Sequence, residues 1–166
     1  MEQSSISLTV SVVALIVAFI SLLRSPKKEE TKKTPAENYN AVPLQLQAYE
    51  RLVLFTDRIN PSNLLIRLNG NSYSAAELHS IILNEVRTEY QHNITQQIYV
   101  SPQAWAVIRR VKDDTLNLIT SAVKGLPEHA TGLDLGKVVL THLSKLEDNP
   151  YDIAIDMIRK DLEHLF

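Results

Sequence analysis

The chain has 166 residues, with 17 Lys and Arg against 19 Asp and Glu, and it has no cysteine. This length allows one anchor and one domain, and the lack of cysteine excludes a disulfide framework, a thiolate metal site and a cysteine nucleophile. Within residues 43–166, twelve basic residues stand against fifteen acidic ones without a basic stripe, so nucleic acid is not an expected partner.

The first element is an apolar run over residues 6–23, which contains no charge, proline or glycine. As a helix it would be ~27 Å long, close to the ~30 Å hydrocarbon core of a bilayer. No Lys or Arg precedes it, so it lacks the basic region of a cleaved signal peptide. The run predicts a single uncleaved transmembrane helix within residues 1–23. The alternative is a buried core helix, but the run has no polar stripe to face water.

Small residues recur along this run at spacings of three and four, which places them on one helical face. Such a seam lets two helix backbones approach in lipid, so it predicts packing against a second copy or another membrane protein. Chance is the alternative, because Ser and Ala are common in membrane helices. The seam consists of Ser7, Ser11, Ala14, Ala18 and Ser21.

Five basic residues follow the apolar run: Arg24, Lys27, Lys28, Lys32 and Lys33. The positive-inside rule therefore predicts an inner (cytoplasmic) membrane protein with its N-terminus outside and residues 24–166 in the cytoplasm. The same residues are expected to contact anionic membrane lipid, at about 1 kcal/mol each near the surface, unless they form only a solvated spacer.

Residues 24–42 are rich in charge and proline and predict a charged flexible linker. A coil of this length would hold its ends roughly 25 Å apart, which keeps the following domain near the membrane. Residues 43–166 predict a soluble, all-α, antiparallel bundle of about five helices, because no stretch alternates with period two.

Helix starts are marked by a capping box at Ser74 and Glu77 and by a cap followed by proline at residues 101–102 and 149–150. Asn-Pro at residues 60–61 and glycine at 125 mark helix ends. The predicted helices cover residues 44–59, a short piece to residue 69, 75–100, 102–124, 133–146 and 150–166.

Polar side chains continue the core-facing stripe of the predicted helix 75–100. Its first half buries Leu78, Ile82 and Val86, and its second half directs carboxyl and amide groups the same way. We call this set the polar belt: Glu85, Glu89, His92, Asn93, Gln96, Gln97 and Tyr99.

Three interpretations of the polar belt compete. It could be a structural hydrogen-bond network, or a helix end that emerges into water. It could be a docking surface for an unknown cytoplasmic protein, because Tyr90, Tyr99 and Trp105 flank it. It could also be a metal or catalytic site, because Glu89 and His92 form the Glu-x-x-His pair of di-metal bundles. The nearest second pair, Asp161-x-x-His164, has aspartate in place of glutamate, and no other catalytic or cofactor motif is present.

Several motifs resemble a family of uncharacterised bacterial single-pass membrane proteins. They lie at residues 47–52, 92–101, 126–127, 130–132 and 148–152, after the anchor and the charged linker. The resemblance implies a bacterial inner-membrane protein and carries over no catalytic residue. Residues and resemblance together predict a membrane-anchored cytoplasmic interaction or scaffold module, an accessory subunit without enzymatic activity or cofactor. The alternative is a bundle-type metalloprotein or metalloenzyme that uses Glu89 and His92.

Overall fold

The computed structural model describes residues 41–163, and this part of the chain is all-α, as predicted. It contains six α-helices and two 3₁₀ helices, and no strand lies among these residues. The elements are α2 (Val42–Ile59), α3 (Pro61–Arg67), η1 (Gly70–Ser72), α4 (Ala75–Asn93), η2 (Ile94–Ile98), α5 (Pro102–Lys124), α6 (Gly132–Leu143) and α7 (Pro150–Leu162).

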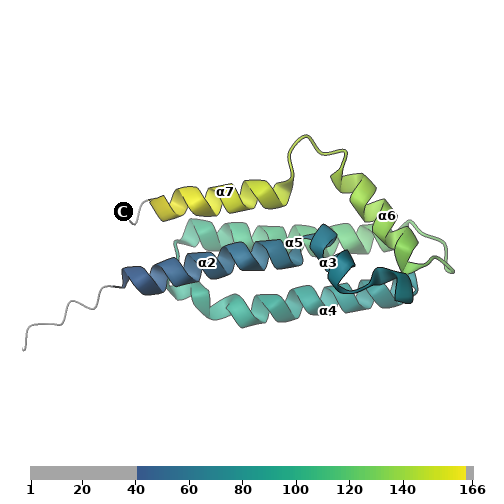
Figure 1. The fold of residues 1–166 in the computed structure, drawn as a ribbon, viewed down its shortest axis with the longest axis horizontal. Coiled ribbons are helices and arrows are strands. Elements are labelled where there is room, and N and C mark those ends of the chain that lie inside the picture. The colour runs from purple at the N-terminus through teal and green to yellow at the C-terminus, as the bar shows by residue number, and fades with distance from the viewer. Residues whose placement is uncertain (1–40, 164–166) are drawn as a thin grey trace, which may run out of the picture. The chain divides into compact units, whose positions relative to one another are not determined.

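The four long helices α2, α4, α5 and α7 lie side by side and alternate in direction (Figure 1). α7 packs against α2 and α5, and α4 packs against the same two helices, so the four enclose one core. α6 crosses α4 and α5 and also contacts α3 and η1. We call the end where α2 begins and η2 lies the tether end, and the end where η1, α4 and α6 meet the bridge end.

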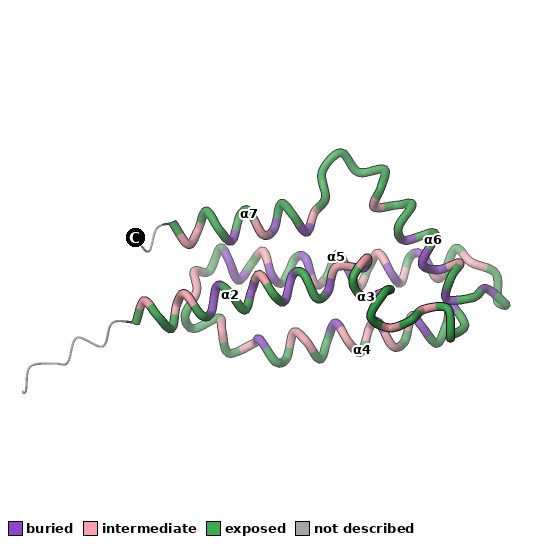
Figure 2. Tube along the Cα trace, viewed as in Figure 1, coloured by how far each residue is buried: buried purple, intermediate pink, exposed green. Residues whose placement is uncertain are grey.

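The core follows from one apolar face on each long helix. Purple segments in Figure 2 recur along α2, α4 and α5 on the sides that face one another. Each large apolar side chain that is fully buried contributes ~1.5–3 kcal/mol relative to exposure. The largest of them are Phe55, Leu52, Ile59, Leu64, Leu78, Ile82, Ile108, Ile119, Leu135 and Ile158.

Side-chain caps fix the helix starts where the sequence predicts them. Ser74 and Glu77 form the expected capping box, and the Ser101 hydroxyl accepts a bond from the Ala104 amide at 3.0 Å. A second capping box, Thr131 with Asp134, opens α6 and was not predicted. In this capping box, aspartate stands where glutamate is usual, and the first residue of the helix is a glycine.

The bridge end is closed by main-chain contacts between the starts of α4 and α6. Ser74 and Thr131 form an antiparallel β-bridge, and the Gly132 amide donates to the Tyr73 carbonyl at 2.8 Å. A Cβ atom on Gly132 would lie 2.1 Å from the Gly70 carbonyl oxygen. Only glycine therefore fits at residue 132 without moving the backbone.

The predicted end of the helix 75–100 is wrong. α4 ends at Asn93, and the chain continues as the 3₁₀ helix η2, so α5 is the longest helix. The Asn93 amide group donates to the Glu89 carbonyl oxygen at 2.8 Å. An Asn side chain that bonds the local backbone competes with helix continuation, and no Gly or Pro marks this change in the sequence.

None of the helices at residues 41–163 combines the length and the apolar character needed to cross a bilayer. The predicted transmembrane helix, its seam of small residues and the five basic residues lie in residues 1–40, outside the described part of the chain.

Candidate functional site

Three residues of the polar belt make internal contacts. Asn93 is buried and donates to the Glu89 carboxylate at 3.3 Å as well as to its carbonyl. The other Glu89 carboxylate oxygen lies 3.1 Å from Nε of Arg58 on α2, and Glu85 lies 3.4 Å from Arg67 on α3. Glu89 and Glu85 therefore link α4 to α2 and α3, and Asn93 supports Glu89 from within α4, as the structural interpretation expects.

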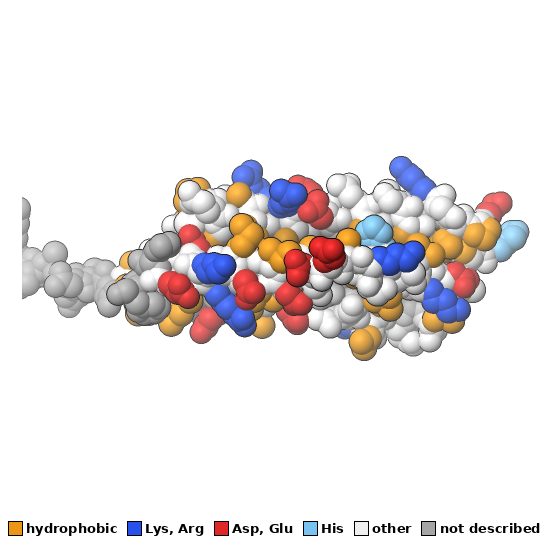
Figure 3. Space-filling view, turned by 90° about the horizontal axis from the view of Figure 1, so that it is seen from above, with side chains coloured by type: hydrophobic (Ala, Val, Ile, Leu, Met, Phe, Trp, Pro, Cys, Tyr) orange, Lys and Arg blue, Asp and Glu red, His pale blue; other side chains and the backbone are white. Residues whose placement is uncertain are grey.

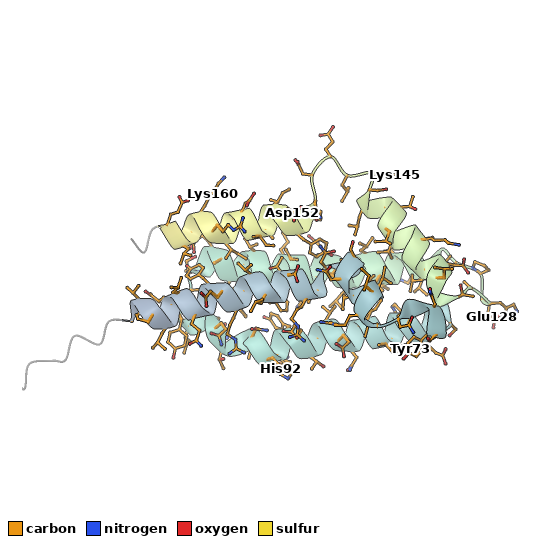
Figure 4. The ribbon with its side chains drawn as sticks, viewed as in Figure 1. Tyr73, His92, Glu128, Lys145, Asp152 and Lys160 are labelled. Carbon is orange, nitrogen blue, oxygen red and sulfur yellow. The ribbon has the colours of Figure 1, made fainter. Side chains whose placement is uncertain are left out.

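The remaining belt residues are more open to solvent. Figure 4 shows His92 on the outer side of α4, and this residue is exposed. η2 turns with three residues per turn instead of 3.6, so the helical phase changes after residue 93. Gln96 is then half-buried and Gln97 exposed, beside Ile98, which is 71% exposed, and Tyr99. The belt is thus divided between residues paired with neighbouring side chains and an exposed corner.

The metal interpretation finds no support in the geometry. Among residues 41–163, no three His, Cys, Asp or Glu side chains lie together as a metal site requires. Glu89 is engaged with Arg58 and Asn93. The carboxylate of Asp161, in the second candidate pair, accepts hydrogen bonds from two hydroxyl groups, and His164 lies outside the described residues.

These hydroxyls belong to a cluster that the sequence did not reveal. Tyr49 on α2 and Ser101 at the start of α5 both donate to one carboxylate oxygen of Asp161 on α7, Ser101 at 2.6 Å. The Ser101 amide donates to the Tyr49 hydroxyl at 3.2 Å. Burial, and then the bond to Asp161, raise the pKa of Tyr49. The cluster joins three helices at the tether end across 112 sequence positions, so no local motif could reveal it.

A second hydroxyl pair holds the start of α7. The Thr115 hydroxyl donates to the Val111 carbonyl at 2.7 Å and lies 2.8 Å from the Tyr151 hydroxyl. Thr115 has one proton to donate, so Tyr151 is the donor between them. Both residues are buried, and burial raises the pKa of Tyr151 to about 12.

Aromatic side chains from α2, α4 and α5 pack against one another. Tyr90 stacks on Trp105 with ring centres 5.5 Å apart, and Phe55 meets Tyr90 edge-on at 6.2 Å. The Lys112 ammonium lies 4.6 Å from the centre of the Tyr90 ring. The aromatic residues that the sequence suggested as interface flanks are therefore largely part of the packing, because Trp105 is buried and Tyr90 half-buried.

An open furrow lies along α5, where α6 and α7 diverge. It consists of adjoining hollows of about 450, 180 and 350 Å³ that share Asp114. Figure 3 shows hydrophobic side chains in a band along the face on which α6 and α7 lie. His142 is exposed and lines this furrow. The α5 furrow has the floor residues Val107, Val111, Leu118 and Ala122 and the rim residues Val138, Leu146, Ile153 and Met157.

A separate groove of about 530 Å³ lies between α2 and α7. Its walls are mostly apolar, with Glu50 and Arg159 as its only charged lining residues. Tyr49, from the hydroxyl cluster, also contributes to its lining. This groove and the α5 furrow lie on either side of α7.

One family model matches the chain over residues 2–165, and it is described as a family of unknown function, DUF7935. No curated protein and no solved structure matches. The family match agrees with the resemblance to an uncharacterised family. It carries no information on a membrane or a bacterial origin, and these stay predictions.

Proposed function

The chain belongs to the DUF7935 family, and from this premise we propose that it is a membrane-tethered interaction module. In this proposal, residues 6–23 anchor the chain in the inner membrane and pack through the small-residue seam against a membrane protein or a second copy. The basic residues 24–33 keep the rest on the cytoplasmic side. The helical bundle then holds a cytoplasmic protein without catalysing a reaction.

The observation that carries this role is the α5 furrow. Its four rim residues are large and apolar, and each is between 42% and 52% exposed. They line three adjoining hollows, Val138 and Leu146 from α6 and the loop after it and Ile153 and Met157 from α7, whereas isolated exposed apolar residues are common and carry little meaning. The lining also includes Arg110, Asp114, Asn117, Ser121 and His142. A mostly apolar depression with some polar groups is typical of a binding surface.

The shape of the furrow favours an amphipathic helix of the partner as its occupant. The floor residues recur on α5 at spacings of four, seven and four, from Val107 to Ala122, so they form one ridge of roughly 22 Å. A partner helix with apolar residues at the same spacing would lie beside this ridge, between α6 and α7.

The furrow replaces the polar belt as the principal docking surface in this proposal. Glu85, Glu89 and Asn93 already have partners within the bundle, and changing them would disturb packing as well as docking. The furrow rim offers exposed side chains whose replacement leaves the core untouched.

Site-specific photocrosslinking in cells tests the docking surface. A crosslinking amino acid would replace Met157 or Val138 on the rim, and Ile66 on α3, which is 81% exposed, would serve as the control. We expect both rim positions to yield adducts with the same segment of one protein, with apolar residues at helical spacing. Met157→Glu should abolish the adduct at Val138, whereas Ile66→Glu should not. Adducts that form equally at Ile66, or that survive Met157→Glu, would overturn the assignment.

The anchor has its own test. Full-length protein should stay with membranes after alkaline carbonate extraction, and removal of residues 6–23 should release it. Recovery of the full-length chain in the aqueous fraction would refute the anchor, whatever the crosslinking shows.

A further inference from the structure

Apart from the apolar run near the N-terminus, the two longest stretches of the chain without a charged or histidine residue lie in and beside the described bundle. They cover residues 38–49 and 93–108, although 22% of the whole chain is charged. The first contains the linker's end and the first turns of α2, and the second contains η2 and the first turns of α5. The two are separated by more than forty residues of ordinary charged sequence.

The fold brings these two stretches together at the tether end. α2 packs against η2, and α5 begins directly after it (Figure 1). Charged groups of α7 also lie at this end of the bundle. Asp161 is bonded to Tyr49 and Ser101, and Lys160 points outward from α7 (Figure 4). Among the described residues, 42–49 of α2 and 94–101 contribute no charged or histidine side chain to the surface of this end, while His92, Glu50 and Arg51 border them and are exposed.

This surface exposes large apolar groups to solvent. Ile98 is 71% exposed, Leu44 is 51% exposed and Tyr99 is 36% exposed. Their other neighbours on η2 are Thr and Gln, which are polar but uncharged. Apolar side chains together with tyrosine and neutral polar groups suit the layer between lipid headgroups and hydrocarbon, where a buried charge would be costly.

The same end of the bundle is the one to which the proposed anchor is joined. Only residues 24–41 separate the apolar run from α2. A segment of this length holds its ends roughly 25 Å apart as a coil, so it confines the start of α2 to the neighbourhood of the bilayer. Local confinement raises the effective concentration of a weak surface contact.

We infer that the tether end rests on the lipid surface, with Ile98, Leu44 and Tyr99 inserted at the level of the headgroups. This inference depends on the proposed membrane anchor. It assigns the exposed corner of the polar belt to lipid and leaves the α5 furrow, which runs along the side of the bundle, free for a protein partner.

The chain's lack of cysteine allows a direct test. Ile98→Cys or Leu44→Cys would carry a single environment-sensitive fluorophore in the full-length protein, reconstituted in vesicles of phosphatidylcholine and phosphatidylglycerol. Ile66→Cys is the control, because Ile66 is more exposed than either test residue and lies on α3. We expect lipids that carry a quencher near the headgroup to reduce the emission at residues 98 and 44 at least twofold, and to leave residue 66 almost unchanged.

The outcomes separate the inference from the proposed function. If the protein floats with the vesicles but residues 98 and 44 are quenched no more than residue 66, the anchor stands and the lipid contact is refuted. If residue 98 is shielded from aqueous iodide but not quenched by lipid, a second copy covers it, and the inference also fails. If the protein does not float, the anchor fails and the lipid contact falls with it. Far-UV circular dichroism of each variant checks that the fold is retained.

Discussion

The junction between α4 and α6 and the attachment of α7 use different kinds of hydrogen bond. At the bridge end, α4 and α6 are joined by main-chain bonds, such as the Ala75 amide to the Ala130 carbonyl at 2.9 Å. α7 is held to its neighbours by two tyrosine hydroxyls, Tyr49 to Asp161 and Tyr151 to Thr115. The first junction depends on how closely two backbones approach, and the second depends on particular side chains and on their protonation.

The two junctions are therefore expected to fail for different reasons. A main-chain contact tolerates most changes of side chain but not an added Cβ at the point of closest approach. A buried hydroxyl fails when its acceptor is removed or when it ionises. Different substitutions, and opposite extremes of pH, should therefore weaken the two junctions.

Gly132→Ala should destabilise the bundle by about 4 kcal/mol, because the new Cβ would meet the Gly70 carbonyl oxygen and force two backbones apart. Gly136→Ala on the same helix is the matched control. Its Cβ would lie 3.6 Å from Leu65, an ordinary contact, and alanine should raise stability by about 0.5–1 kcal/mol. Urea unfolding of the full chain in mild detergent measures both. Equal effects of the two changes would show that the close approach does not matter.

Alkaline pH should weaken the attachment of α7. The folded-state pKa of Tyr151, about 12, lies above its ordinary value of 10.0, so its contribution to stability is complete below pH 10 and is lost as the pH rises towards 12. A two-unit shift corresponds to about 3 kcal/mol. The raised pKa of Tyr49 acts in the same direction. Tyr151→Phe should flatten the fall in unfolding free energy between pH 10 and 12.

The bridge end should respond to the opposite extreme of pH. Bonds from Ser74 and Thr131 lower the pKa of Glu77 and Asp134 in the two capping boxes. Their contribution is present above the ordinary carboxyl pKa and is lost as the pH falls through the lowered values. This division would be contradicted if Tyr151→Phe still lost unfolding free energy steeply in alkali and the unfolding free energy did not change in acid.

Asp161→Ala should cost about 2 kcal/mol, because the Tyr49 and Ser101 hydroxyls would lose a common acceptor. Asp161→Asn keeps an acceptor oxygen and should cost less. Asp156→Ala, on the same helix, removes only an exposed ion pair with Arg159 and should change the unfolding free energy by less than about 0.5 kcal/mol. If Asp161→Ala behaved like Asp156→Ala, the cluster would not hold α7.

The sequence was sufficient for features that depend on neighbouring residues. The all-α class and the starts of α4, α5 and α7 are confirmed, because caps and first-turn prolines act within one helical turn. The end of α4 was not predictable in this way. Asn93 carries no stop signal of its own, and its effect depends on its bond back to Glu89.

The candidate site was only partly predictable for the same reason. The periodicity placed Asn93 on the core side of its helix, and the structure buries it. The α5 furrow exists because α6 and α7 diverge, which no single stretch of sequence specifies. The partners of Tyr49 lie on other helices, so the sequence could place this residue in the core but could not identify the bond to Asp161.

The stack of Tyr90 on Trp105 has a practical consequence. Trp105 is the sole indole of the chain, and its ring lies beneath the surface of the tether end. Its ultraviolet emission needs no label, and the emission should not change when the corner around Ile98 merely touches lipid. The same emission should shift to longer wavelength when α4 and α5 separate, so one native optical signal distinguishes adsorption of the intact bundle from its opening.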